Sequence, residues 1–179
     1  MKIVLMIVTI SCIFSQANYQ ILSTASNFKD IFEIDDFYDN YHYSIFNSLF
    51  PNDIDLFTFT ISAKKTKNHN VFVTLKNLDY GELTNSENNY NFNAKESLIK
   101  LSIIKKNTIA EKIMLNLSYL KSTIDIYQSD AISADLLASF KMWKNHYFNI
   151  AFKNFGEIIN SYSDTNIKLP STFNFSYSF

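Results

Sequence analysis

Hydrophobic and polar residues alternate through the middle of the chain, and this alternation predicts β-strands. In the segment Phe57–Ile61, hydrophobic side chains at 57, 59 and 61 are separated by threonines. A period of two places one kind of side chain on each face of a strand. The same period recurs in residues 71–76, 99–103, 113–119 and 124–126. We expect these strands to form an antiparallel sheet with one face in water.

The last eight residues, Thr172–Phe179, have the most regular alternation in the chain. Aromatic residues at 173, 175, 177 and 179 are separated by asparagine and serines. The pattern predicts a final strand that pairs within the sheet and brings its four aromatic side chains to the core.

Two segments have hydrophobic residues three or four positions apart, which is the spacing of an α-helix. In Asn27–Phe50 this spacing indicates a helix that ends before Pro51. The aromatic residues around Tyr41–Phe46 suit a strand equally well, and this alternative stays open. The second segment predicts a long helix between about Ser133 and Tyr162, with Ser133 as its N-cap.

The long helix would have two hydrophobic stripes about 100° apart. The first stripe comprises Leu136, Phe140, Trp143, Tyr147 and Ile150. The second comprises Leu137, Phe148, Phe152, Phe155 and Ile159. An ordinary surface helix buries one stripe of about 100°. We therefore expect an α+β fold in which one stripe packs on the sheet, while the other contacts either a ligand or another helix.

The N-terminal residues have the features of a secretory signal peptide. Lys2 precedes the hydrophobic run Ile3–Phe14, and Ser15-Gln16-Ala17 is a small-x-small cleavage site. The run is shorter than the roughly 20 residues that a membrane-spanning helix needs. Residues 1–17 are expected to be removed, which leaves residues 18–179 as a single secreted, extracellular domain.

Composition narrows the possible partners. All 16 basic residues are lysines, and the formal net charge is −1. Phosphate recognition commonly uses the arginine guanidinium group, and the largest basic cluster in the sequence is Lys64, Lys65 and Lys67. The composition therefore argues against a nucleic-acid partner. The only cysteine, Cys12, lies in the signal peptide, so the mature domain has no thiol nucleophile.

No catalytic motif is present, and we expect neither enzymatic activity nor a cofactor. The histidines His42, His69 and His146 have no second ligand at metal-binding spacing. The acidic residues of 35–39 lack the ligand pattern of a calcium loop. No metal site is therefore expected.

Two sequons predict a glycoprotein. They are Asn116-Leu117-Ser118 and Asn174-Phe175-Ser176. Both asparagines fall on the polar side of a predicted strand, where a glycan could fit.

Three short segments lie at the ends of the predicted elements. Phe50-Pro51-Asn52 follows the first helix, Ile61-Ser62-Ala63 ends a strand, and Leu169-Pro170 precedes the last strand. In this order the chain resembles the C-terminal half of the bactericidal/permeability-increasing protein and its lipid-transfer relatives, the tubular lipid-binding (TULIP) family. The resemblance implies a strongly twisted antiparallel sheet wrapped around the long helix, with an apolar groove between them. The glycine usual before Leu-Pro is missing, as is the N-terminal half with its disulfide.

Two functions are open at this point. In the leading hypothesis the protein is a secreted lipid-binding module, with an acyl chain or phospholipid in the groove against the stripe Leu136, Phe140, Trp143, Tyr147 and Ile150. In the alternative it is a structural or interaction protein of an extracellular coat, where exposed aromatic side chains contact a protein partner or a membrane surface.

Overall fold

A computed structural model describes residues 43–65, 69–85, 87, 89–106, 110–144, 146–162 and 168–178. Within these ranges the regular secondary structure is entirely β. Eight strands follow one another as neighbours in a single sheet, and each is antiparallel to the next. The strands are β1 (Tyr43–Phe50), β2 (Ile54–Lys65), β3 (His69–Asn85), β4 (Tyr90–Lys105), β5 (Lys112–Ile124), β6 (Tyr127–Trp143), β7 (His146–Asn160) and β8 (Thr172–Ser178).

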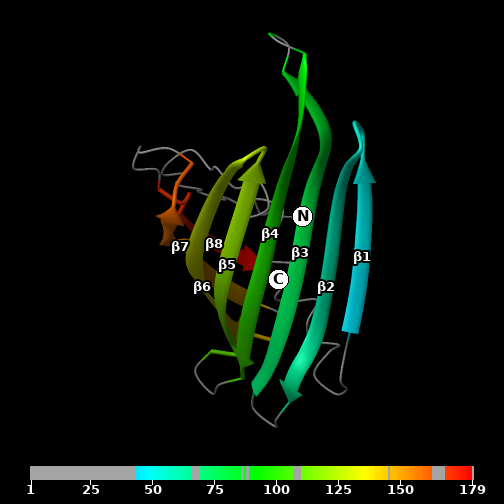
Figure 1. Cartoon of the computed structure of the whole chain (residues 1–179). Helices are drawn as coiled ribbons and strands as arrows, with labels where there is room; N and C mark the ends of the chain where they lie inside the picture. Colours follow the sequence, from blue (N-terminus) through cyan, green and yellow to red (C-terminus); the bar gives the residue numbers. More distant parts are fainter. Residues whose placement is uncertain are drawn as a thin grey trace, which may run out of the picture.

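The sheet curls, so that β6, β7 and β8 lie behind β4 and β5 in Figure 1. Its two edge strands are β1 and β8. The connections that follow β1, β3, β5 and β7 lie at one end of the strands, which we call the first end. The connections that follow β2, β4 and β6 lie at the other end, which we call the second end.

Asparagine and aspartate supply the left-handed backbone positions of the tight turns at the first end. Asn52 and Asp53 have φ values of 65° and 59°, Asn89 has 52° and Asp125 has 55°. These residues adopt positive φ more readily than other non-glycine residues do. The hairpins therefore form although the chain has only two glycines.

The predicted helix between Ser133 and Tyr162 is wrong, and so is the α+β fold class. Residues up to Trp143 belong to β6, and His146–Asn160 forms β7. Hydrophobic residues at 136 and 140 fit a helix, but an even spacing also puts them on one face of a strand. Alanines at 134 and 138 complete that alternation. The turn at Lys144 and register shifts between β6 and β7 interrupt it, which produces an apparent helical period.

The first predicted helix is also wrong where it can be compared, because Tyr43–Phe50 is β1. The open alternative of a strand around Tyr41–Phe46 agrees with β1 from Tyr43 onward. Residues 27–42 and the predicted signal peptide, 1–17, lie outside the described residues. The wrapped-helix fold implied by the TULIP resemblance is therefore corrected to an all-β sheet.

Four of the predicted strands of the middle region are confirmed and are longer than their patterns indicated. Segments 57–61, 71–76, 99–103 and 113–119 lie inside β2, β3, β4 and β5. The predicted continuation at 124–126 is wrong, because β5 ends at Ile124 and the next two residues form the turn to β6. The predicted C-terminal strand pairs with β7, as β8. Its aromatic residues do not enter a core, however: Phe173 and Tyr177 are 40% and 37% exposed.

Burial distinguishes the two faces of the sheet. In β5 every second residue from Lys112 to Ser122 is buried, and most residues between them are exposed. The register aligns these buried positions with those of β4 and β6. We call the face with the buried side chains the inner face and the opposite one the outer face. A curled sheet encloses the side chains of its concave face, so the inner face is the concave one.

The inner face is strongly polar. Of the described residues that are buried, 13 are hydrophobic and 16 are polar or charged, and all of these 16 except Asp130 are on the inner face. All of the hydrophobic ones except Ala94 and Ala110 form two separate clusters. One, toward the first end, contains Leu56, Leu78, Leu98, Leu120, Ala131 and Leu169. The other, toward the second end, contains Phe72, Ile104, Met114, Leu137 and Ala151. Between the clusters the side chains are mainly hydroxyls, amides and charged groups.

Hydrogen bonds to Asp135 join three strands in this polar region. The side-chain amide of Asn116 on β5 donates to one carboxylate oxygen at 3.0 Å, and the backbone N–H of Asn154 on β7 donates to the other at 2.7 Å. Asn154 has a φ of 58° and lies at a register shift, where β7 has an extra residue. Its own amide donates to the carbonyl oxygen of Pro170. Asp135 therefore fixes the irregularity that leads into β8.

Replacing Asp135 by alanine should lower the free energy of unfolding by about 1–3 kcal/mol, because the Asn116 amide and the Asn154 N–H would remain buried without an acceptor. Denaturant unfolding of the full chain measures this change. The matched control is Glu87→Ala, which removes one carboxylate from an exposed turn. It should change the free energy of unfolding by less than about 0.5 kcal/mol. Equal destabilisation by both substitutions would contradict the assigned role of Asp135.

Candidate functional site

A continuous hydrophobic surface covers the middle of the outer face, and we call it the apolar belt. Its members lie opposite one another in the register of β2 to β8. They are mainly branched aliphatic residues, with phenylalanine toward β8. The belt comprises Phe59, Ile61, Val71, Val73, Leu75, Ile99, Leu101, Ile103, Ile113, Leu115, Leu117, Ile132, Leu136, Ile150, Phe152, Phe155 and Phe173.

Many belt side chains are openly exposed. Leu117, at the middle of β5, is 49% exposed, and Phe155 is 77% exposed. Isolated exposed hydrophobic residues are normal in soluble proteins, but a contiguous surface across seven strands is not. The belt is therefore the candidate functional site.

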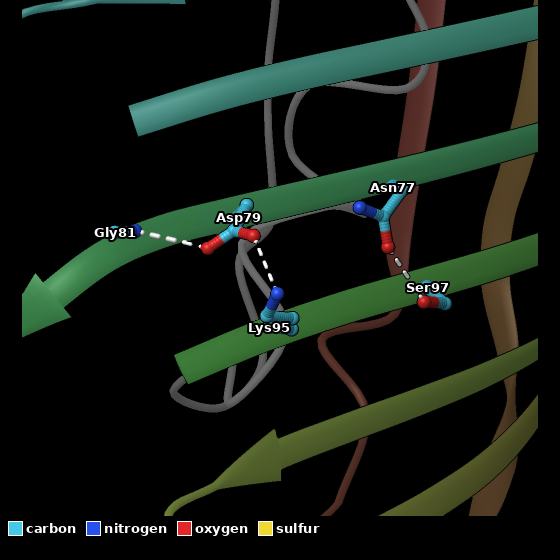
Figure 2. Close-up of polar contacts among 5 residues, drawn as sticks. All are labelled: Asn77, Asp79, Gly81, Lys95 and Ser97. Carbon is cyan, nitrogen blue, oxygen red and sulfur yellow. Dashed lines mark hydrogen bonds and ion pairs between the residues drawn. The ribbon is translucent and has the colours of Figure 1, made fainter. Parts of the chain in front are cut away.

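Toward the first end, the outer face changes abruptly from hydrophobic to polar. On β3 and β4, Lys95 forms an ion pair with Asp79 at 2.7 Å, and Ser97 donates to Asn77 at 2.9 Å (Figure 2). The pair with Lys95 lowers the pKa of Asp79. Gly81 has a φ of 70° and donates its N–H to the same carboxylate. We call this polar border the first margin.

The first margin continues across β5, β6 and β7 through Asp130. Its carboxylate accepts hydrogen bonds from Asn160 at 3.0 Å, the Tyr119 hydroxyl at 2.7 Å and Gln128 at 2.9 Å. These bonds lower the pKa of Asp130, while the bond to Asp130 raises the pKa of Tyr119. The donors themselves cover Asp130, which is 4% exposed, and desolvation offsets only part of their effect. Tyr119 thus has its ring beside the belt and its hydroxyl in the margin.

At the second end the belt is bordered by aromatic and basic side chains, which we call the second margin. Trp143 is 77% exposed, and its ring lies edge-on to that of His146 with 6.2 Å between centroids. His146 stacks on Tyr177 and shares a hydrogen bond with its hydroxyl. Lys105 is exposed at the end of β4. Both borders of the belt therefore contain residues with an apolar body and a polar tip.

A hollow of about 760 Å³ lies within the belt. Its walls include Leu101, Leu117, Ile132 and Phe155, and its lining also includes Gly156 and Ala134. A Cβ on Gly156 would lie 2.0 Å from the carbonyl oxygen of Ile132, so only glycine permits this approach of β7 to β6. The small residues thus leave a depression about the width of four strands, from β4 to β7.

The sheet places the predicted lipid-binding residues differently from a helical stripe. The outer face includes Leu136, Phe140 and Ile150, and Trp143 lies in the second margin. Tyr147 alternates with Phe148 and so points to the other face. The second predicted stripe is also divided, because Leu137 is buried on the inner face while Phe148, Phe152 and Phe155 are on the outer one.

The two sequon asparagines lie on the inner face. Asn116 is 3% exposed and donates to Asp135, so the folded sheet has no room for a glycan there. Asn174 is half-buried and pairs with Ala151 of β7.

The alternation in the sequence predicts most of the belt residues as one face of a sheet. The usual expectation is that the hydrophobic face of a strand is buried. The sequence feature that favours the reverse arrangement is the serine, threonine and asparagine content of the alternate positions. These residues occupy the inner face, where Thr60 bonds to Thr74 and Asn149 donates to Ser176.

No protein-family model, curated protein or solved structure matches the chain. Among the described residues there is no helix long and apolar enough to cross a membrane. The same ranges contain no group of three or more side chains suited to hold a metal ion.

The margin at Asp130 should make stability depend on acidic pH. Its folded-state pKa lies below the unfolded value of about 3.9, so its contribution is present above that pH and is lost as pH falls through the folded pKa. In Asp130→Ala the decrease in unfolding free energy between pH 6 and pH 3 should be smaller than in the parent. In Tyr119→Phe, which removes one of three donors, the decrease should be intermediate. An identical pH dependence in all three proteins would refute this role.

Proposed function

We propose that the protein is a lipid-bilayer protein whose outer face lies against acyl chains. The observation that supports this most is the polarity of the two faces. Of the 16 buried polar or charged residues among those described, all but Asp130 are on the inner face, while the outer face exposes aliphatic and aromatic side chains. In water, hydrophobic side chains are driven inward. In hydrocarbon, strands are stable with apolar residues outward and polar residues inward.

The borders of the belt favour a bilayer over a protein partner. Tyrosine and tryptophan concentrate where hydrocarbon meets the headgroup region, because each has an apolar ring and a polar group. Tyr119 occupies such a position at the first margin, and Trp143 and Tyr177 do so at the second. A typical protein partner covers about 800 Å² of one side of a protein. The belt instead follows the convex side of the curled sheet from β2 to β8.

The length of the belt along a strand also fits a bilayer. On β6, Ile132 lies opposite Tyr119 of the first margin, and Trp143 belongs to the second. The eleven steps between them correspond to about 37 Å at 3.4 Å per residue. A tilted strand needs about 9–11 residues to cross a hydrocarbon layer of about 30 Å.

Lipid binding, the leading hypothesis from the sequence, is thus proposed for a different surface. The hollow beside Gly156 can accommodate an acyl chain, and burying its walls would stabilise the complex by about 25 cal/mol per Å² of apolar surface. The extracellular coat remains the competing function, and the experiment below distinguishes it.

Leu117→Asp tests the proposal at the centre of the belt. If the outer face contacts acyl chains, placing a carboxylate there should cost about 2 kcal/mol. The equilibrium constant for the folded protein bound to phosphatidylcholine vesicles should therefore fall roughly 30-fold. Flotation measures association, and the emission of Trp143, the only tryptophan, should shift to the blue in the parent protein.

Ser97→Asp is the matched control, because it adds the same charge on the outer face but within the first margin. It should leave association nearly unchanged. A parent protein that does not float with vesicles, with unchanged Trp143 emission, would overturn the lipid proposal. If Leu117→Asp then dissolved an assembly of the protein, the coat function would replace it.

A further inference from the structure

The charged residues of the sheet are divided between its two ends. The described acidic residues at the first end outnumber the lysines there, which are Lys95, Lys121 and Lys168. These acidic residues are Asp53, Asp55, Asp79, Glu82, Glu87, Glu96, Asp125, Asp130 and Glu157. At the second end the sign is reversed, and Glu111 is the one acidic residue among those described. The lysines there are Lys64, Lys65, Lys105, Lys106, Lys112, Lys141 and Lys144.

The register brings several of the basic residues together. Lys65, the last residue of β2, lies opposite Asn70 of β3. His69, which precedes Asn70 in β3, lies opposite Lys105 of β4. Lys106 follows directly in the connection to β5. Lys105 and Lys106 are both exposed. Adjacent strand ends thus form one basic edge beside the second margin.

We infer that this basic edge binds the anionic headgroups of a bilayer leaflet, which orients the sheet with its second end at that leaflet. The inference rests on the proposed function, since it adds the class of lipid and the orientation. The basic edge complements anionic headgroups in charge, and it lies beyond the apolar belt, at the level where headgroups begin. Basic residues next to a membrane surface are attracted by anionic lipids over about one Debye length.

The whole-chain charge makes this inference specific. With a formal net charge of −1, the protein as a whole has no attraction for an anionic surface. Any preference for anionic vesicles must therefore come from a local basic region. The acidic first end should at the same time be repelled, which favours one orientation over the other.

The double substitution Lys105→Gln and Lys106→Gln tests the edge. A lysine beside an anionic surface contributes about a fivefold increase in partitioning, so losing two should weaken binding about 25-fold. The probes are vesicles of phosphatidylcholine with 30% phosphatidylglycerol (about a third anionic, a typical strongly charged surface) and vesicles of phosphatidylcholine alone. On the neutral vesicles the variant should bind like the parent, and 0.5 M salt (roughly a 4 Å Debye length) should remove the parent's preference for anionic vesicles.

Lys121→Gln with Lys168→Gln is the matched control, because it removes the same charge from exposed positions at the first end. It should retain the preference for anionic vesicles. An equal loss in both double variants, or no preference in the parent, would overturn the inference. A parent that binds neutral vesicles but has no anionic preference would leave the proposed function standing, whereas a parent that binds neither would refute the proposed function itself.

Discussion

The strict alternation of a β-strand, together with the polar composition of the inner positions, is the constraint on which the rest of the structure depends. Because successive side chains point to opposite faces, a strand with serine or asparagine at its inner positions places the hydrophobic residues that alternate with them outside. In β5, Asn116, Ser118 and Ser122 are inner residues, and Leu115 and Leu117 are consequently outer ones. The inner face alone then offers only two small hydrophobic clusters to stabilise eight strands.

The polar interior compensates through hydrogen bonds rather than apolar burial. Thr60 and Thr74 bond across β2 and β3, Tyr80 donates to Glu96, and Asn149 donates to Ser176. Burial and the neighbouring Glu96 carboxylate raise the pKa of Tyr80. Each such bond contributes only about 1 kcal/mol net in water. A hydrocarbon environment changes this balance, because the outer side chains then contribute through contact with lipid.

A hydrocarbon environment also places a demand on the two edge strands. β1 and β8 each have one hydrogen-bonded neighbour in the described sheet. An unpaired backbone group in hydrocarbon costs several kcal/mol. In a bilayer the free edges of β1 and β8 therefore require partners, either from this chain or from a neighbouring molecule.

The sequence predicted the strands of the middle region and the C-terminus because their period of two extends over long segments. It failed between residues 133 and 162, where Ala134 and Ala138 hid the alternation, and where the register shift at Asn154 displaced it. The candidate site was predicted only in part. Leu136, Phe140 and Ile150 are on the outer face, but periodicity does not say whether a hydrophobic face meets a core or a solvent of lipid.

Two adjacent residues of β4 allow a direct test of whether the outer face lies against acyl chains. Leu101 is on the outer face and 37% exposed, whereas Ser102 is on the inner face and 7% exposed. Spin labels on Leu101→Cys and Ser102→Cys, in a Cys12→Ser background in vesicles, report collision with dissolved oxygen and with a water-soluble nickel complex. If the outer face lies against acyl chains, the label at 101 should collide mainly with oxygen, as in hydrocarbon, and the label at 102 should do so much less. A label at 101 that collides freely with the nickel complex would contradict this arrangement.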